Sequence, residues 1–540
     1  MGTYLNPGNS GFSRIIKKAY IDKTGLIGII NRAIGTTNNL ICISRPRRFG
    51  KSYAAQMLCA YYEKTCDSHE LFDKYSISND DSYDKHINKY HVISLDITGF
   101  ISDTKKKRTS LAEIPEKIDA ALLKETHKLY PELREITDLN ECLLELVRIS
   151  ETKIVFIIDE WDSMIREARD DDEAQESYLN LLRGWFKNNN FTPEAVAAAY
   201  MTGILPIKKD GSQSAISDFI EYSMLDPGEF AGYAGFTEAE VNRICEESDL
   251  QFEEMKLWYD GYTVGEKHSI YNPYSVMHAS GSGKFKSYWK KTSAAETLIT
   301  YIDMDQDDLQ DTIARLIAGE SVIVDTDSFQ NDVDTFTCKD DVLTLLTHLG
   351  YLTYEEEPDS YDDDTVAGLV RIPNEEVRSE FDKILRKAKH KSLIGLVKRS
   401  DRLLKDTLEG KSDEVAKAIA DVHDSEYAPT YYSNEQSLRY VVKMAYISCV
   451  DQYAKVEELP SGHGIADVVF LPKRRSTLPA MIVELKWNRD AEGAIQQIKY
   501  RNYPKLLANY GGKILLVGVS YNEDVKIHDC VIEEYDPRKK

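Results

Sequence analysis

Three consecutive residues, Gly50, Lys51 and Ser52, have the types and the order needed to bind a phosphate chain. They follow the apolar run Leu40–Ser44 and precede a stretch of helical character that starts at Tyr53. Backbone N–H groups at the start of such a helix wrap phosphates, a lysine adds positive charge, and a serine hydroxyl joins the ligands of Mg²⁺. Gly-Lys-Ser alone is common, and its neutral interpretation is a helix start with an exposed lysine. Its place after a buried strand favours a nucleotide site.

A pair of carboxylates ends a second apolar run, Lys153–Glu160. At the end of a buried strand, Asp159 can hold Mg²⁺ through water, while Glu160 polarises the attacking water. Either acid alone could simply cap a strand. The two elements in this order, about 100 residues apart, predict a P-loop nucleotide triphosphatase that binds ATP and Mg²⁺.

Two further features belong to the predicted nucleotide site. Thr202 closes the run Ala195–Gly203, where it would lie beside the γ-phosphate, although a threonine that merely ends a strand is an equal alternative. Arg45, Arg47 and Arg48 could reach phosphates or act between subunits. Arg45 also stands where the pattern G-x-x-x-x-G-K-[ST] has its first glycine, which is a departure from that pattern.

A second set of carboxylates lies near the C-terminus. Glu484 and Lys486 are two residues apart in an apolar run, so both side chains point to one face of a strand. With Asp467 on another strand, they could hold a divalent metal and steady the charge on a cleaved phosphodiester. The default interpretation of Glu-x-Lys is a solvated strand face, and the additional aspartate favours the D…E-x-K nuclease site.

The elements that must position these residues follow from periodicity. Short apolar runs alternate with amphipathic segments in the first part of the chain, which is typical of a buried parallel sheet flanked by helices. The predicted fold is α/β, with a P-loop domain over residues 1–235. Its expected strands are Leu40–Ser44, His91–Ile97, Ile154–Asp159, Ala195–Met201 and Tyr222–Leu225.

The rest of the chain changes character twice. Residues 236–425 favour helices, with a winged-helix-like part near 340–380 made by extended runs at Gly350–Tyr354 and Ala367–Ile372. The acidic turn between these runs would repel phosphates, so a protein contact is the favoured interpretation. Residues 430–540 predict a small α/β domain with strands at Asp467–Leu471, Ala480–Lys486 and Lys513–Val519, and helices at Asn434–Tyr453 and Glu492–Leu507.

Composition limits the classes of function. The net charge of −23 argues against a protein that coats nucleic acid by bulk electrostatics. Acidic and basic residues nearly balance after residue 430, so that part could still approach DNA or RNA. No apolar run reaches the roughly 20 residues that span a bilayer, and no signal peptide is evident, which predicts a cytoplasmic protein without a membrane partner. The eight scattered cysteines indicate reduced, structural thiols.

The motifs together resemble the bacterial AAA-ATPase-like family that carries a C-terminal PD-(D/E)XK nuclease domain. The resemblance spans nearly the whole chain, and the family's usual loop has arginine at the position of Arg45. It therefore implies that the complete loop binds nucleotide: Arg45, Pro46, Arg47, Arg48, Phe49, Gly50, Lys51 and Ser52. The matching segments are Tyr20–Thr24, Arg45–Ser52, Ile158–Asp162, Thr202–Ile204, Gly235–Thr237, Trp258–Tyr262, Tyr271–Ser275, Gly350–Thr353 and Ile372–Asn374.

For the C-terminal domain, the resemblance implies a PD-(D/E)XK nuclease with Mg²⁺ or Mn²⁺. It adds Gln497, which matches the helix after the E-x-K strand, and Glu435, which fits an additional acidic metal ligand. Ile465 stands where the family usually has arginine.

Two functions are therefore open. The first is an ATPase whose nucleotide state controls a nuclease acting on DNA or RNA through residues 430–540. The second is a signalling NTPase switch whose nuclease-like domain only binds nucleic acid, with a protein partner or a second copy of the chain on the middle region.

Overall fold

The fold is described from a computed structural model of the chain. The structure describes residues 2–169, 171–207, 216–233, 235–289, 309–326, 329, 338–356, 367–385, 391–426, 435–461, 464–472, 478–501, 507 and 513–536. These residues fall into two compact units, each described here by itself. Unit 1 comprises Met1–Phe285 and Val324–Gly368, and unit 2 comprises Lys286–Ile323 and Leu369–Lys540.

A five-stranded parallel sheet forms the centre of unit 1, in the order β2-β3-β4-β1-β5. The predicted α/β class is therefore confirmed for this part of the chain. Two predicted strands have the observed limits, and β5 lies earlier in the sequence than expected. The strands are β1 (Leu40–Ser44), β2 (His91–Asp96), β3 (Ile154–Asp159), β4 (Val196–Gly203) and β5 (Ile220–Tyr222).

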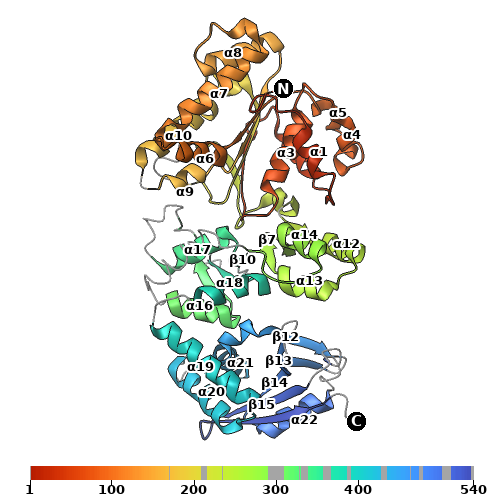
Figure 1. The fold of residues 1–540 in the computed structure, drawn as a ribbon, viewed down its shortest axis with the longest axis vertical. Helices are drawn as coiled ribbons and strands as arrows, with labels where there is room; N and C mark the ends of the chain where they lie inside the picture. The colour runs from red at the N-terminus through yellow and green to blue at the C-terminus, as the bar shows by residue number, and fades with distance from the viewer. Residues whose placement is uncertain are drawn as a thin grey trace. The chain divides into compact units, whose positions relative to one another are not determined.

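Helices cover both faces of this sheet (Figure 1). On one side lie α1 (Ser10–Ile15), α3 (Lys51–Tyr62), α4 (His69–Phe72) and α5 (Tyr83–His86); on the other lie α6 (Ile97–Lys107), α7 (Ile114–Leu129), α8 (Leu139–Ser150) and α10 (Asp172–Phe186). Shorter helices are α2 (Gly25–Ala33), α9 (Ser163–Glu167) and α11 (Thr192–Ala195). Because parallel strands are buried on both faces, their residues are apolar almost throughout.

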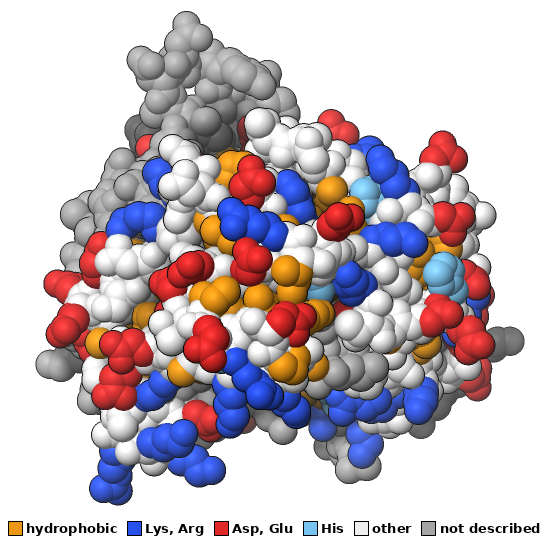
Figure 2. Space-filling view, turned by 90° about the horizontal axis from the view of Figure 1, so that it is seen from above, with side chains coloured by type: hydrophobic (Ala, Val, Ile, Leu, Met, Phe, Trp, Pro, Cys, Tyr) orange, Lys and Arg blue, Asp and Glu red, His pale blue; other side chains and the backbone are white. Residues whose placement is uncertain are grey.

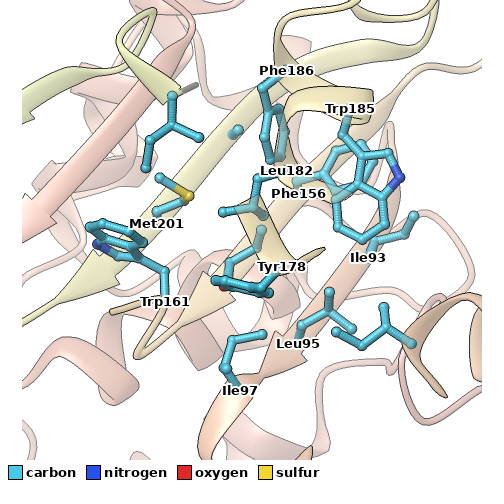
Figure 3. Close-up of a cluster of buried hydrophobic side chains, with 14 of the residues drawn as sticks. Ile93, Leu95, Ile97, Phe156, Trp161, Tyr178, Leu182, Trp185, Phe186 and Met201 are labelled. Carbon is cyan, nitrogen blue, oxygen red and sulfur yellow. The ribbon is translucent and has the colours of Figure 1, made fainter. Parts of the chain in front are cut away.

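Alternate residues of each strand enter two separate cores. Ile154, Phe156 and Ile158 of β3 pack on the α6–α10 side, whereas Val155 and Ile157 pack on the α3 side. Figure 3 shows part of the first core, in which the ring of Phe156 lies 5.3 Å from the rings of both Trp185 and Phe186. Trp161, fully buried in the same core, follows directly after Glu160. The polar end of β3 is thus attached to a rigid apolar anchor.

The remaining elements of unit 1 follow the parallel sheet. A small sheet in the order β6-β8-β7 was not predicted, because its strands are only two to five residues long. The elements are β6 (Phe236–Thr237), α12 (Glu238–Ser248), α13 (Phe252–Tyr259), β7 (Tyr262–Val264), β8 (Lys267–Tyr271), α14 (Pro273–Ser282), α17 (Lys339–Leu349) and β10 (Thr353–Glu356). Helices α12 and α17 lie within residues 236–425, the part of the chain in which the sequence favours helices.

The strands proposed for a winged-helix-like hairpin are present as β10 and β11 (Ala367–Arg371), which are neighbours in one sheet. The acidic turn between them lies outside the described residues. The chain passes between the two units after Phe285, within β9 (Val322–Asp325) and within β11. The winged-helix assignment and the three-domain division stay predictions.

Unit 2 contains a five-stranded mixed sheet in the order β12-β13-β14-β15-β16, in which only β14 and β15 are parallel. Its strands are β12 (Tyr453–Ser461), β13 (Gly464–Pro472), β14 (Ala480–Trp487), β15 (Ile514–Asn522) and β16 (Ile527–Tyr535). The helices are α16 (Leu309–Ala318), α18 (Glu375–Leu385), α19 (Lys391–Leu408), α20 (Ser412–Glu426), α21 (Glu435–Ala445) and α22 (Ala491–Tyr500).

The charge of the protein is mixed on the face shown in Figure 2. Acidic and basic side chains lie next to one another there, around small apolar patches. The net charge of −23 therefore does not give that face a field of one sign. Over the described residues, no helix is both long enough and apolar enough to cross a bilayer.

Candidate active sites

The loop between β1 and α3 carries the first candidate site. α3 begins at Lys51, and Gly50 precedes it with a φ of 88°, a left-handed conformation that favours glycine. The first N–H groups of a helix have no partner within the helix and attract anions. Ser52 is exposed one residue further along. The local backbone thus has the form that the sequence predicted for a phosphate-binding loop.

Lys51 is buried, and its ammonium group is held by the loop itself. Nζ donates to the carbonyl oxygens of Arg45 at 2.9 Å and Pro46 at 3.0 Å. Oε1 of Glu160 lies 3.7 Å from the same nitrogen. Burial lowers the pKa of the Lys51 ammonium below its ordinary value, and the Glu160 carboxylate opposes that change. The structure therefore brings together the lysine and the glutamate that sequence patterns placed in one site.

The two acids at the end of β3 meet the end of β4. The hydroxyl of Thr202 donates to Oδ1 of Asp159, and the backbone N–H of Trp161 donates to the Thr202 carbonyl oxygen at 2.9 Å. Parallel pairing of β3 with β4 produces this proximity. Glu160 has a φ of 54°, and burial raises the pKa of its carboxyl. Asp159, Glu160 and Thr202 thus share one edge of the sheet.

A cavity of about 500 Å³ opens beside the loop. Its polar wall includes Lys51, Ser52 and Glu160. The larger part is apolar and comes from segments distant in the sequence, several of which belong to the motifs that carry the family resemblance. These lining residues include Tyr20, Ile21, Leu26, Met57, Tyr233, Phe236, Tyr274 and Met277.

Arg45 contributes to the loop through both its backbone carbonyl oxygen, which accepts from Lys51, and its guanidinium. The side chain is 2% exposed, and its Nη1 donates to the carbonyl oxygens of Ser44 and Tyr222, both at 2.9 Å. Burial lowers the pKa of Arg45 to about 10. Arg45 thereby joins the loop to the edge strand β5, a contact that a glycine could not make, and the binding of phosphate by Arg45 stays a prediction.

The other loop residues have different surroundings. Arg47 is exposed, and Phe49 is buried with its ring 5.1 Å from that of Tyr262. The guanidinium of Arg48 lies 4.3 Å from the ring centre of Tyr274 on α14, and both residues line the cavity. Of the three predicted arginines, Arg48 is the one whose side chain lines the cavity.

One arginine of this site escaped the sequence patterns. Arg166, on α9, places Nη2 2.9 Å from Oε2 of Glu160 and Nε 2.9 Å from Oδ2 of Asp162. Burial acts to lower the pKa of Arg166, but the Asp162 and Glu160 carboxylates outweigh it and raise that pKa. The only sequence signal is a spacing of four residues from Asp162, which is common on helices.

The predicted carboxylates of unit 2 also come together. Asp467 of β13 and Glu484 of β14 lie on adjacent antiparallel strands, and both side chains are buried. Nζ of Lys486 lies 3.7 Å from Oε1 of Glu484, and Nε2 of Gln497 on α22 donates to the same oxygen. The four residues therefore lie together in one cluster, and their roles in a metal or nuclease site stay predictions.

Glu484 is the electrostatically unusual member of this cluster. Burial first, and then the neighbouring Asp467 carboxylate, raise the pKa of Glu484 to about 8. Its Oε2 is buried and has no hydrogen-bond partner within the described part of the chain. Among those residues, no group of three or more His, Cys, Asp or Glu is arranged to hold a metal ion. Glu435 is the first residue of α21.

Asp467 has a cationic partner that the sequence did not indicate. Nη2 of Arg439, on α21, lies 2.5 Å from Oδ1 of Asp467, and the Leu485 N–H donates to Oδ2 at 2.9 Å. The family's usual arginine would stand at Ile465, two residues before Asp467. A cation thus reaches Asp467 from a helix 28 residues earlier in the chain, a distance at which no local pattern exists.

Comparison with solved structures finds distant similarity to two ORC proteins and a Cdc6p protein. The Aeropyrum pernix ORC2 protein, in ADPNP and ADP complexes, is 13% identical, with 69% of this chain and 98% of that chain covered and a TM-score of 0.33. The A. pernix ORC1 protein in complex with DNA is 9% identical, with 71% and 98% covered and a TM-score of 0.28. Cdc6p from Pyrobaculum aerophilum is 10% identical, with 70% and 98% covered and a TM-score of 0.25.

No curated protein matches the sequence. A family model described as a predicted AAA-ATPase matches residues 7–212, which include the loop before α3, the acids at the end of β3 and Thr202. The cluster of Asp467 and Glu484 lies outside this match. Over residues 7–212 the chain is therefore similar to the predicted AAA-ATPase family, which supports an ATPase-like, nucleotide-binding P-loop region there.

Proposed function

We propose that the chain hydrolyses ATP and that its nucleotide state controls a metal-dependent nuclease in residues 430–540. The observation that supports ATP hydrolysis is the approach of Lys51 and Glu160 to 3.7 Å beside a cavity of about 500 Å³. A cavity of this size is suitable for a small-molecule cofactor. The phosphates of ATP would occupy the polar end of the cavity at Lys51 and Ser52. The adenine base of ATP would occupy the apolar end at Tyr20 and Tyr233.

Mg²⁺ fits the polar end of this cavity. Ser52 is exposed and lines the cavity, and Asp159 provides a carboxylate fixed by the Thr202 hydroxyl. Hard cations prefer such oxygen ligands. Ser52 and Asp159 would hold the ion, which neutralises charge on the phosphates when bound. Glu160 would accept the proton of the attacking water, and Thr202 would lie near the γ-phosphate.

A divalent metal also fits the cluster of unit 2. Among the described residues, Oε2 of Glu484 is buried without a hydrogen-bond partner, and Glu484 and Asp467 repel each other; a cation would relieve both conditions. Asp467, Glu484 and Glu435 would hold Mg²⁺ or Mn²⁺, which would activate water for attack on a phosphodiester. Lys486 and Gln497 would orient the carboxylate and the water. DNA or RNA would approach this domain.

A second function has an observation in its favour. The Arg439–Asp467 ion pair compensates the Asp467 charge without a metal. A domain held in this way would bind nucleic acid without cleaving it, and the chain would act as a nucleotide-dependent switch. Its partner, a second protein or another copy of the chain, would contact residues 236–425.

Cleavage assays separate the two functions. We expect wild-type protein with Mg²⁺ or Mn²⁺ to nick DNA or RNA, and Glu484→Gln to lose cleavage while it keeps ATP hydrolysis. Glu533→Gln is the matched control, because Glu533 pairs with Lys499 on an exposed face. Cleavage by Glu484→Gln equal to that of wild type would reject the nuclease assignment.

The control by nucleotide needs its own comparison. Wild type should cleave at different rates with and without ATP, and Lys51→Ala should lose that difference. A cleavage rate that is the same in all four reactions would reject nucleotide control, even if the nuclease is active. No cleavage and no Mn²⁺ binding by wild type would favour the switch.

A further inference from the structure

Arg166 contacts Glu160 from the short helix α9, which follows β3. Its guanidinium spans two carboxylates, with Nη2 2.9 Å from Oε2 of Glu160 and Nε 2.9 Å from Oδ2 of Asp162. Nη2 also lies 3.2 Å from the hydroxyl of Ser163. A planar guanidinium has several donors in fixed directions, so it can hold two acids in one relative orientation. Arg166 therefore connects Glu160 to a second, deeper acid.

That deeper acid is fixed to the backbone. The Asp162 side chain is fully buried, and its Oδ2 accepts from the N–H groups of Ile204 at 3.1 Å and Leu205 at 3.0 Å. Both residues directly follow β4. Asp162 thus has little freedom to move. The contact of its Oδ2 with Nε of Arg166 restrains Arg166 in turn.

The two oxygens of the Glu160 carboxylate have different surroundings. Oε2 accepts from Arg166, whereas Oε1 lies 3.7 Å from Nζ of Lys51. Glu160 also lines the cavity, and its backbone has a left-handed φ of 54°. A non-glycine residue in that conformation is held there by its surroundings. Oε2 of Glu160 is thereby restrained by Arg166, and Oε1 is directed towards Lys51.

We propose that Arg166 is a positioning residue for ATP hydrolysis, which holds Oε2 of Glu160 so that Oε1 stays directed at the reacting end of the nucleotide. The inference rests on the proposed function, because it needs Glu160 as the base. Arg166 acts through Glu160 and not on the nucleotide. This arrangement matches a general rule, in which a base is itself oriented by a third group. The alternative is an ion pair that serves stability alone.

Steady-state kinetics of three variants distinguish these roles. Arg166→Gln should lower kcat on the order of 100-fold, the cost expected for a misplaced reacting group. KM and the Kd of a fluorescent ATP analogue should stay within about threefold of wild type, since the phosphate contacts of Lys51 and Ser52 are intact. Arg183→Gln is the control, because Arg183 makes an exposed ion pair with Glu176 on α10. It should hydrolyse ATP at the wild-type rate.

Arg166→Lys is a second variant that still tests the proposal if Arg166→Gln does not fold. Lysine keeps the positive charge beside Asp162 but lacks the fork that reaches both acids. We expect a kcat between those of wild type and Arg166→Gln, with unchanged ATP binding. A wild-type kcat in a folded Arg166→Lys or Arg166→Gln protein would overturn the inference.

A double variant tests whether the effect passes through Glu160. In single-turnover phosphate release, Glu160→Gln with Arg166→Gln should be no slower than Glu160→Gln alone, because the group to be oriented is already gone. Losses that multiply in the double variant would show that Arg166 acts by another route. If Glu160→Gln itself hydrolyses ATP like wild type, the base assignment in the proposed function fails. If Glu160→Gln is inactive while both Arg166 variants are normal, only this inference fails.

Discussion

Nζ of Lys51 lies 3.7 Å from Oε1 of Glu160 while it donates to two loop carbonyl oxygens, those of Arg45 and Pro46. In this state the loop supplies the partners that a buried ammonium needs. Under the proposed function, phosphate oxygens would exchange with these partners when nucleotide binds. Oε1 of Glu160 would then face water, while Arg166 still holds Oε2. The relationship therefore links binding at Lys51 to the availability of Glu160.

Replacement of Lys51 by methionine separates binding from folding. Lys51→Met should lower the affinity for ATP on the order of 100-fold, because a charge-assisted hydrogen bond is worth up to about 3 kcal/mol. Thermal stability without nucleotide should fall, since the substitution leaves two loop carbonyl oxygens without a donor and Glu160 without one of its cationic neighbours. Titration with a fluorescent ATP analogue and a melting curve measure both. Lys64→Met, which removes a contact to Thr152, should bind ATP normally.

Gly203 is expected to tolerate no side chain. A Cβ atom there would lie 2.7 Å from Nε1 and 2.9 Å from Cδ1 of Trp161, which is fully buried. Gly203→Ala should reduce the free energy of unfolding by about 1–3 kcal/mol through overpacking. Gly99→Ala on α6 is the control, because the nearest atom there lies at 3.8 Å. Equal denaturation midpoints for Gly203→Ala and wild type would contradict this packing.

Acid should destabilise unit 1 through buried histidines. Burial lowers the pKa of His91 from 6.5 to about 4, where its ring nitrogens contact Asn6 at 3.1 Å and Ser150 at 3.0 Å. Between pH 6.5 and 4, the His91 imidazole therefore binds a proton in the unfolded chain but not in the folded chain. The contribution of neutral His91 to the free energy of unfolding is complete above pH 6.5. About 3 kcal/mol of that contribution is lost as the pH falls to 4.

The measurement is the free energy of unfolding at several pH values between 7 and 4. His91→Gln should show a shallower decline than wild type across this window. His348 acts in the same direction, because burial lowers its pKa to about 3. Parallel curves for wild type and His91→Gln would exclude a contribution from His91.

Metal removal should affect unit 2 in a pH-dependent way. The pKa of Glu484 rises from 4.5 to about 8, so the folded chain favours the protonated acid. The contribution of protonated Glu484 to the free energy of unfolding is complete below pH 4.5. It is lost as the pH rises through 8. With EDTA, the melting temperature of wild type should therefore fall between pH 6 and 9, and that of Glu484→Gln should fall less.

Addition of Mn²⁺ at pH 9 should restore the melting temperature of wild type but not that of Glu484→Gln. A cation binds the two ionised carboxylates and removes their repulsion. Restoration in both proteins would place the ion elsewhere, and restoration in neither would support a domain that binds no metal.

The fold could be predicted where burial dominates the sequence. β1 and β3 have the predicted limits, because strands buried on both faces are continuous apolar runs. β5 lies at Ile220–Tyr222 and not at Tyr222–Leu225, because its limits depend on pairing with β1 at the sheet edge. The edge strand β12 was missed, since its sequence contains charged residues and Pro460 and has little apolar alternation. The helix predicted to Tyr453 ends at Ala445, and a 3-10 helix over Ile447–Asp451 follows before β12 begins at Tyr453.

The candidate sites follow the same division. Local patterns indicated Lys51, Glu160, Asp467 and Glu484, whose roles depend on neighbours in sequence. Arg439 could not be predicted, because its contact exists only after distant segments pack. The orientation of Arg45 likewise depends on β5, which has no sequence relation to the loop.

Phosphate release from ATP by wild type and Glu160→Gln, measured beside ATP binding by both, tests the central claim most directly. Wild type is expected to bind ATP and release phosphate, and Glu160→Gln is expected to bind ATP with similar affinity and release phosphate at least about 100-fold more slowly. Equal release by the two proteins, or no ATP binding by wild type, would contradict a hydrolytic site built on Lys51 and Glu160.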